Sequence, residues 1–102
     1  MLMIDPGTTP DIGIELPVNS GMLEAAFVTF MQGSKVVFEK SLDAMRFEGK
    51  KMILALSQEE TLSFEESTAG EWQIRYRVQG DKAFQTVIMP YGVGRVLKKG
   101  VI

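Results

Sequence analysis

The chain has 102 residues, of which 45% are hydrophobic and 24% charged, with a net charge of −2 and no histidine or cysteine. This length and apolar content suit one domain with its own core, and the near-neutral charge argues against nucleic acid or an anionic membrane as a partner. The lack of cysteine excludes disulfides, thiolate nucleophiles and thiolate metal sites.

The sequence predicts an irregular N-terminal arm, residues 1–10, followed by a single β domain, residues 11–102. Pro6 and Pro10 cannot donate to a sheet ladder, and the pair Pro6-Gly7 favours a turn. The start of the chain lacks the cationic and apolar regions of a signal peptide, and no segment is long enough to span a bilayer. We therefore expect synthesis and first folding in the cytoplasm.

The first half of the domain predicts a strand and a hairpin. Residues 11–16 place Ile12, Ile14 and Leu16 on one side, and the following proline ends the pairing. Residues 23–31 and 35–41 flank a glycine, which indicates a hairpin. Both faces of 23–31 are apolar, so we expect a central strand that is covered on both sides.

A second hairpin and a short helical turn follow. Residues 44–48 and 51–56 flank Gly49-Lys50. Ser57 and Glu60 have the spacing of a capping box, in which each side chain binds the other residue's backbone amide. One helical turn is expected here, carrying Leu62 and Phe64 to the core.

Strict alternation marks the strand at residues 70–78. Trp72, Ile74, Tyr76 and Val78 alternate with polar residues, as in a strand with one dry face. A turn at residues 80–82 then leads into 83–89. Proline interrupts at position 90, and residues 91–97 are expected to form a last strand or a bent continuation.

Six to eight short strands separated by glycine-bearing turns predict an all-β, antiparallel sandwich. A connection with one helical turn before a tryptophan-containing strand resembles the corner of an immunoglobulin-like sandwich. A small β-barrel is the alternative.

The residues that could carry chemistry favour no enzyme. Five carboxylates invite a reading as general acids and bases or as calcium ligands, but four of them are adjacent pairs that point in divergent directions. We interpret them as solvated charge plus the helix cap; they are Glu59, Glu60, Glu65, Glu66 and Glu71. Lys40 and Lys51 alternate with core residues, so neither is a desolvated base for a serine. Gly92-Val93-Gly94 lacks the following helix of a phosphate loop and is interpreted as relief of a bend.

We therefore expect no catalytic, cofactor-binding or metal-ligating residues and no cofactor. Gln73, Arg75 and Arg77 form a polar row that we interpret as a solvated sheet face, because an RNA-binding sheet would expose its aromatic residues. A basic tail is formed by Arg95, Lys98 and Lys99. Trp72 could stack on a sugar, but its place in the apolar row favours a core anchor.

Three blocks of the chain, residues 56–64, 72–77 and 95–102, carry a resemblance to a family of small proteins encoded in prophages of Gram-positive bacteria, among virion structural genes. In outline the similarity covers residues 8–102, including the hairpin at 27–38. The resemblance implies a structural or tail-associated role, protein partners in a phage particle and association with the virion. It brings no catalytic or binding residues with it.

The sequence thus predicts a non-enzymatic interaction module that acts through its surfaces and edge strands, with phage proteins or a second copy as partners. The expected edges are residues 11–16 and the segment around Pro90. A carbohydrate-binding module is the alternative and a hydrolase is third. Exposure of Trp72 separates the first two hypotheses, because sugar stacking needs a solvent-accessible ring.

Overall fold

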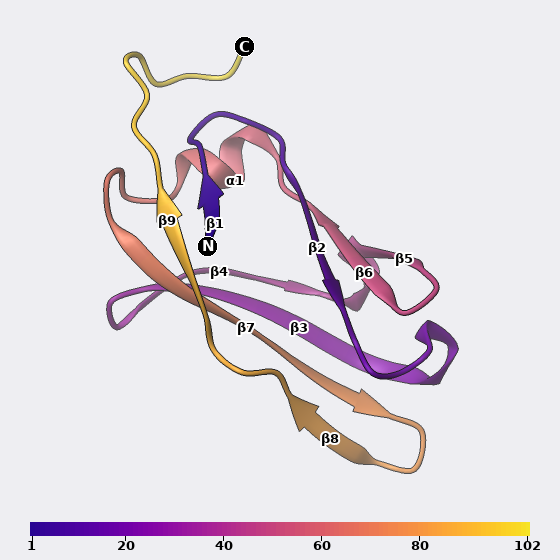
Figure 1. Ribbon diagram of the computed structural model, residues 1–102. Coiled ribbons are helices and arrows are strands. Elements are labelled where there is room, and N and C mark those ends of the chain that lie inside the picture. Colours follow the sequence, from indigo (N-terminus) through magenta and orange to yellow (C-terminus); the bar gives the residue numbers. More distant parts are fainter.

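The computed structural model describes residues 1–102 and contains two β-sheets (Figure 1). The larger sheet has six strands and the smaller sheet has three, and no strand pair joins one sheet to the other. The prediction of a sandwich is therefore confirmed, and the barrel alternative is wrong.

The larger sheet is antiparallel except at one edge. Its strand order is β1 (Leu2–Ile4), β9 (Met89–Val93), β7 (Ala69–Val78), β3 (Leu23–Gln32) and β4 (Lys35–Ser41). The short strand β8 (Lys82–Gln85) pairs with the second half of β7, next to β9 along the same side. Only β1 and β9 run parallel.

The smaller sheet has the order β2 (Asp11–Glu15), β6 (Lys51–Ala55) and β5 (Met45–Glu48). The helix α1 (Gln58–Leu62) connects β6 to β7 and so joins the two sheets. Two short 3₁₀ helices, η1 (Ser20–Met22) and η2 (Leu42–Ala44), precede β3 and β5.

Both predicted hairpins form around the expected glycines. Gly33 between β3 and β4 has φ +61°, and Gly49 between β5 and β6 has φ +62°. Glycine adopts these left-handed angles without steric cost, and a glycine at the first position of a two-residue loop suits the twist of the flanking strands.

The core lies between the sheets. The dry face of β7 is confirmed, since Trp72, Ile74, Tyr76 and Val78 are all buried. Phe30 on β3 is the centre of an aromatic cluster, and its ring lies 5.1 to 5.8 Å from the rings of Phe38, Phe64, Trp72 and Tyr91. The smaller sheet and its continuation close the core with Ile12, Leu16, Met52, Leu54 and Leu56.

The N-terminal arm is only partly irregular, which corrects the expectation for residues 1–10. Leu2–Ile4 forms β1, and Ile4 is fully buried in the core. The partner of β1 is β9, almost ninety residues later in the sequence, and parallel pairing with Gly92 and Val93 fixes the strand there. The turn expected at Pro6-Gly7 is present, with Gly7 at φ +80°.

The edges and the last strand also differ from expectation. β2 bounds the smaller sheet, as predicted. The segment around Pro90 is not an edge throughout, because β1 covers β9 from Tyr91 onward. The last strand ends at Val93 and includes Pro90, which lies opposite Glu71 before β1 begins.

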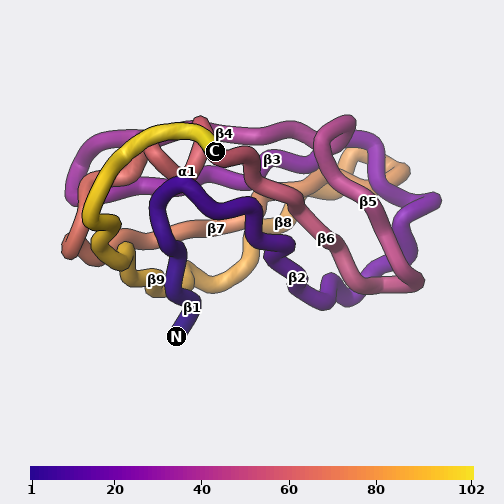
Figure 2. Tube along the Cα trace, turned by 90° about the horizontal axis from the view of Figure 1, so that it is seen from above, coloured from indigo at the N-terminus to yellow at the C-terminus, as the bar shows by residue number.

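The C-terminal segment folds back over α1, as Figure 2 shows from above. The side-chain amide of Gln58 donates to the carbonyl oxygen of Ile102 at 3.1 Å and accepts from its amide at 2.7 Å. The chain has no helix with the length and apolar character needed to cross a membrane.

Candidate functional site

The surface with most potential for contact is the outer face of the larger sheet, on the side opposite the core. Because side chains alternate along a strand, every second residue of β3 and β7 points outward. Four such residues on each strand form the centre of this face, and none of them is buried. The cross-strand pairs of this outer face are Ala25 with Arg77, Phe27 with Arg75, Thr29 with Gln73, and Met31 with Glu71. The expectation that β3 is covered on both faces is therefore wrong, although its central position is confirmed.

Phe27 is the apolar centre of this surface. Its side chain is 37% exposed, which is unusual for an aromatic residue on a central strand. The guanidinium of Arg75 lies 5.8 Å from the centre of the Phe27 ring, within the range of a cation–π contact. An exposed aromatic ring beside an arginine is the kind of anchor on which protein interfaces depend.

Two of the open hollows on the outer face share Arg75. The first has a volume of about 470 Å³, contains no carboxylate, and is lined by Ala25, Phe27, Arg75, Tyr76, Arg77, Ala83, Phe84 and Gln85. The second has a volume of about 270 Å³ and is lined by Thr29, Met31, Glu39, Glu71, Trp72, Gln73, Arg75 and Ile88. The outer face therefore carries charges of both signs, and Glu24 beside Arg77 adds a carboxylate near the first hollow.

The arginines of the outer face have only weak partners within the chain. Arg75 lies 3.6 Å from a carboxylate oxygen of Glu39, and Arg77 lies 3.7 Å from one of Glu24. All four side chains are at least 40% exposed, and ion pairs of this kind contribute little to stability. Little stability would accordingly be lost if either guanidinium group exchanged its carboxylate for another molecule.

Trp72 belongs to the core. It is 6% exposed, and its ring stacks nearly parallel to that of Phe30 with the centroids 5.7 Å apart. A sugar platform needs an open aromatic face, so this burial counts against the carbohydrate-binding alternative.

The basic tail does not extend the arginine row. Arg95, Lys98 and Lys99 follow β9, whose end lies beside the start of β7, whereas Arg75 and Arg77 lie in its second half. The two basic groups are thus at opposite ends of the sheet.

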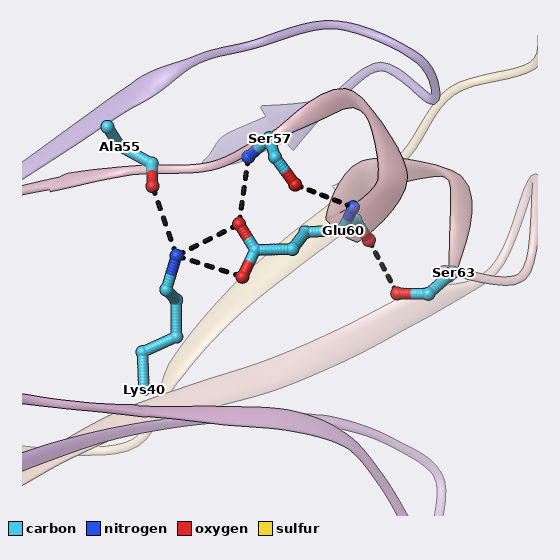
Figure 3. A network of polar contacts seen from close by, with 5 residues as sticks. All are labelled: Lys40, Ala55, Ser57, Glu60 and Ser63. Carbon is cyan, nitrogen blue, oxygen red and sulfur yellow. Dashed lines mark hydrogen bonds and ion pairs between the residues drawn. The ribbon is translucent and has the colours of Figure 1, made fainter. Parts of the chain in front are cut away.

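The carboxylates do not gather into a site. No group of three or more acidic side chains comes together in a way that could hold a metal ion. Glu60 instead completes the predicted capping box (Figure 3): its amide donates to the Ser57 hydroxyl at 3.1 Å, and its carboxylate accepts from the Ser57 amide at 2.8 Å.

Lys40 connects this cap to the larger sheet. Its ammonium lies 2.8 Å from Oε2 of Glu60 and donates to the carbonyl oxygen of Ala55 at 3.3 Å (Figure 3). Lys40 therefore joins β4, β6 and α1 on one side of the sandwich. An inward-pointing charge on an edge strand also protects that edge from pairing with other chains.

Substitution of Ser57 by alanine is expected to lower the free energy of unfolding by about 0.5–2 kcal/mol, because an N-cap hydroxyl is lost. Chemical denaturation measures this loss. Ser57→Thr keeps the hydroxyl and should remain close to the parent; equal losses in the two variants would contradict the role of the cap.

The cap also predicts a pH dependence. Partial burial raises the pKa of Glu60, but the hydrogen bonds and charge of Lys40 and the bonds from Ser57 outweigh it, so the pKa lies below its ordinary value of 4.5. A depressed pKa in the folded state stabilises the fold above the unfolded pKa, and that contribution is lost as the pH falls through the folded value.

We therefore expect the stability difference between the parent and Glu60→Gln to shrink as the pH is lowered from neutral to about 3. Denaturation series at several pH values give this difference directly. A difference that stays constant or grows in acid would show that the Glu60 carboxylate is not stabilised by its neighbours.

Comparison with known proteins yields structural matches only. No family model and no curated protein matches the sequence. Two solved structures of mouse leukocyte-associated immunoglobulin-like receptor 1, both strand-swapped dimers, are 14% identical to the chain. Its immunoglobulin-like domain matches with a TM-score of 0.49 over 92% of this chain and 88% of that one. Its extracellular domain matches with a TM-score of 0.50 over 92% and 87%.

The chain has an immunoglobulin-like fold. The order β9-β7-β3-β4 in one sheet and β2-β6-β5 in the other agrees with immunoglobulin sandwiches, in which strands G, F, C and C′ form one sheet and strands B, E and D lie in the other. The predicted fold class is thereby confirmed. At this level of identity the similarity establishes the fold alone, and function has to be argued from the surface.

Proposed function

We propose that the immunoglobulin-like chain is a non-enzymatic interaction module of a phage or prophage particle, acting through protein–protein contacts of the outer face. The observation that carries this proposal is the half-exposed Phe27, flanked by Arg75 on a central pair of strands. Aromatic and arginine side chains are enriched at protein interfaces and carry much of their binding energy.

The ionisable groups support a non-enzymatic function. Catalysis near neutral pH needs groups whose pKa lies near 7, and the chain has neither histidine nor cysteine to supply them. The two groups with shifted pKa values are displaced away from neutrality. The pKa of Glu60 is lowered by Lys40 and by the bonds from Ser57, and burial raises the pKa of Tyr91, whose hydroxyl donates to the carbonyl oxygen of Met31 at 2.8 Å.

The phage assignment is supported by the sequence resemblance at residues 56–64, 72–77 and 95–102. The first of these blocks contains the capped helix α1, and the second lies on β7, where buried residues alternate with Gln73, Arg75 and Arg77 of the outer face. The outer face is an open sheet surface, as expected for a module that works by contact.

The test is binding to the products of the neighbouring genes. We expect at least one of these proteins to bind the chain in calorimetry, and we expect Phe27→Ser to weaken that binding at least about tenfold by removing an anchor side chain. Leu97→Ser is the matched control, because Leu97 is 92% exposed and lies outside the outer face.

Two results would contradict the proposal. One is binding that Phe27→Ser and Leu97→Ser affect equally. The other is a chain that binds none of these proteins yet hydrolyses a glycan or an ester at a rate abolished by a single Glu→Gln substitution.

A further inference from the structure

Resting on the proposed function, the geometry points to a second copy of this chain as a partner of the outer face, docked about a two-fold axis that crosses β7 at Ile74. The reason is the distribution of charge along β7. Glu71 and Arg77 both point outward, and each lies three residues from Ile74, on opposite sides.

A two-fold axis that lies parallel to the sheet and perpendicular to β7 reverses the strand direction in the second copy. The β7 strands of the two copies then run antiparallel across the interface, and Glu71 of each lies over Arg77 of the other. In such a two-fold interface each contact occurs twice, once from each chain. Glu71 and Arg77 are six residues apart, about 20 Å along the strand, so the two ion pairs do not interfere with each other.

The same axis produces complementary shapes on β3. Ile74 is in register with Val28, so the axis crosses β3 at Val28. Ala25 of one copy then lies over Met31 of the other, a small side chain opposite a large one. Phe27 lies beside Thr29 of the other copy, which brings the two Phe27 rings together near the axis.

The pairing also leaves no arginine facing another one directly. Arg75 lies over Gln73 of the second copy, whose amide oxygen can accept from the guanidinium. Each Arg75 keeps Glu39 of its own chain 3.6 Å away, which offsets the charge near the axis.

The outer face carries both positively and negatively charged side chains. This favours a second copy of the chain over a partner whose surface carries charges of one sign only. A uniformly acidic partner would be attracted by Arg75 and Arg77 but repelled by the carboxylates beside them, Glu24, Glu39 and Glu71. A uniformly basic partner would be attracted by these carboxylates but repelled by the two arginines. A second copy rotated by the two-fold axis places Glu71 and Arg77 of one chain over the opposite charges of the other.

The experiment exchanges the charges and measures mass by sedimentation equilibrium over a range of concentrations. The parent should form dimers. Arg77→Glu and Glu71→Arg should each raise the dimer dissociation constant at least about 100-fold, because each places like charges together at two symmetric positions.

An equimolar mixture of Arg77→Glu and Glu71→Arg should restore association, since the two variants offer opposite charges at both positions. The matched control is Arg95→Glu, which makes the same charge change in the exposed tail and should dimerise like the parent. Because all substituted side chains are exposed, thermal melts should show each variant folded.

A parent that stays monomeric, a single variant that dimerises as well as the parent, or a mixture that stays monomeric would each overturn this self-pairing. The proposed function is tested independently of this self-pairing. If self-pairing fails while a neighbouring gene product binds and Phe27→Ser weakens it, the outer face still serves a protein of different identity.

Discussion

Replacing Phe30 by alanine should lower the free energy of unfolding by about 3–5 kcal/mol, a large part of the about 5–15 kcal/mol available to a domain. Phe30 is fully buried and contacts four aromatic rings from β4, β7, β9 and the segment after α1. Its removal leaves a cavity in the middle of this aromatic cluster, and the surrounding rings cannot collapse into it without losing their edge-to-face contacts.

Chemical denaturation followed by the fluorescence of the single tryptophan provides the measurement, since Trp72 stacks on Phe30. Phe30→Leu retains most of the apolar volume and should be less destabilised. If Phe30→Ala were as stable as the parent, the aromatic cluster would not be the centre of the core.

Replacing Gly70 by alanine should cost about 3 kcal/mol, the upper end of the range for overpacked sites. A methyl group at this position would lie 2.3 Å from the carbonyl oxygen of Met31 and 2.3 Å from the ring of Tyr91. One of these neighbours is backbone in the central strand β3 and the other is a buried ring, so neither can move aside cheaply. The ring of Tyr91 lies over Gly70 because only a glycine leaves room for it.

Gly21→Ala is the matched control for this prediction. Nothing lies within 4 Å of a methyl group at Gly21, so the same chemical change should be neutral or should stabilise the chain by restricting its unfolded state. Thermal melts of both variants give the comparison, and similar melting temperatures would show that the close packing over Gly70 is not required.

Local patterns predicted most of the elements. The alternation in residues 72–78 gave the correct buried face, and the glycines at 33 and 49 marked both hairpin turns. The spacing of Ser57 and Glu60 was sufficient for the capping box, because a cap is made by residues three positions apart. In each of these cases the physical cause lies within a few residues of the pattern.

Local sequence patterns could not predict contacts between segments that lie far apart in the chain. The strand β1 exists because β9 offers it an edge, and nothing within Leu2–Ile4 alone indicates that pairing. The bond between Lys40 and Glu60 likewise joins different layers of the sandwich, and Lys40 had been assigned only an alternating position in its strand.

The sequence predicted the contribution of β7 to the outer face but not that of β3. The row of Gln73, Arg75 and Arg77 was recognised as a polar sheet face, but its apolar partner Phe27 was assigned to a covered strand. Only the antiparallel register of β3 and β7 places Phe27 beside Arg75. A solvent-exposed aromatic residue cannot be distinguished from a core residue by alternation when both faces of the strand are apolar.

Nuclear magnetic resonance can locate the surface through which the chain binds a partner, residue by residue. Isotope-labelled chain would be titrated with the neighbouring gene product that binds it, and the backbone amide shifts would be followed. We predict the largest changes at Ala25, Phe27 and Met31 on β3 and at Gln73, Arg75 and Arg77 on β7. Changes confined to β2, β5 and β6 of the smaller sheet, with the outer face unaffected, would contradict the account.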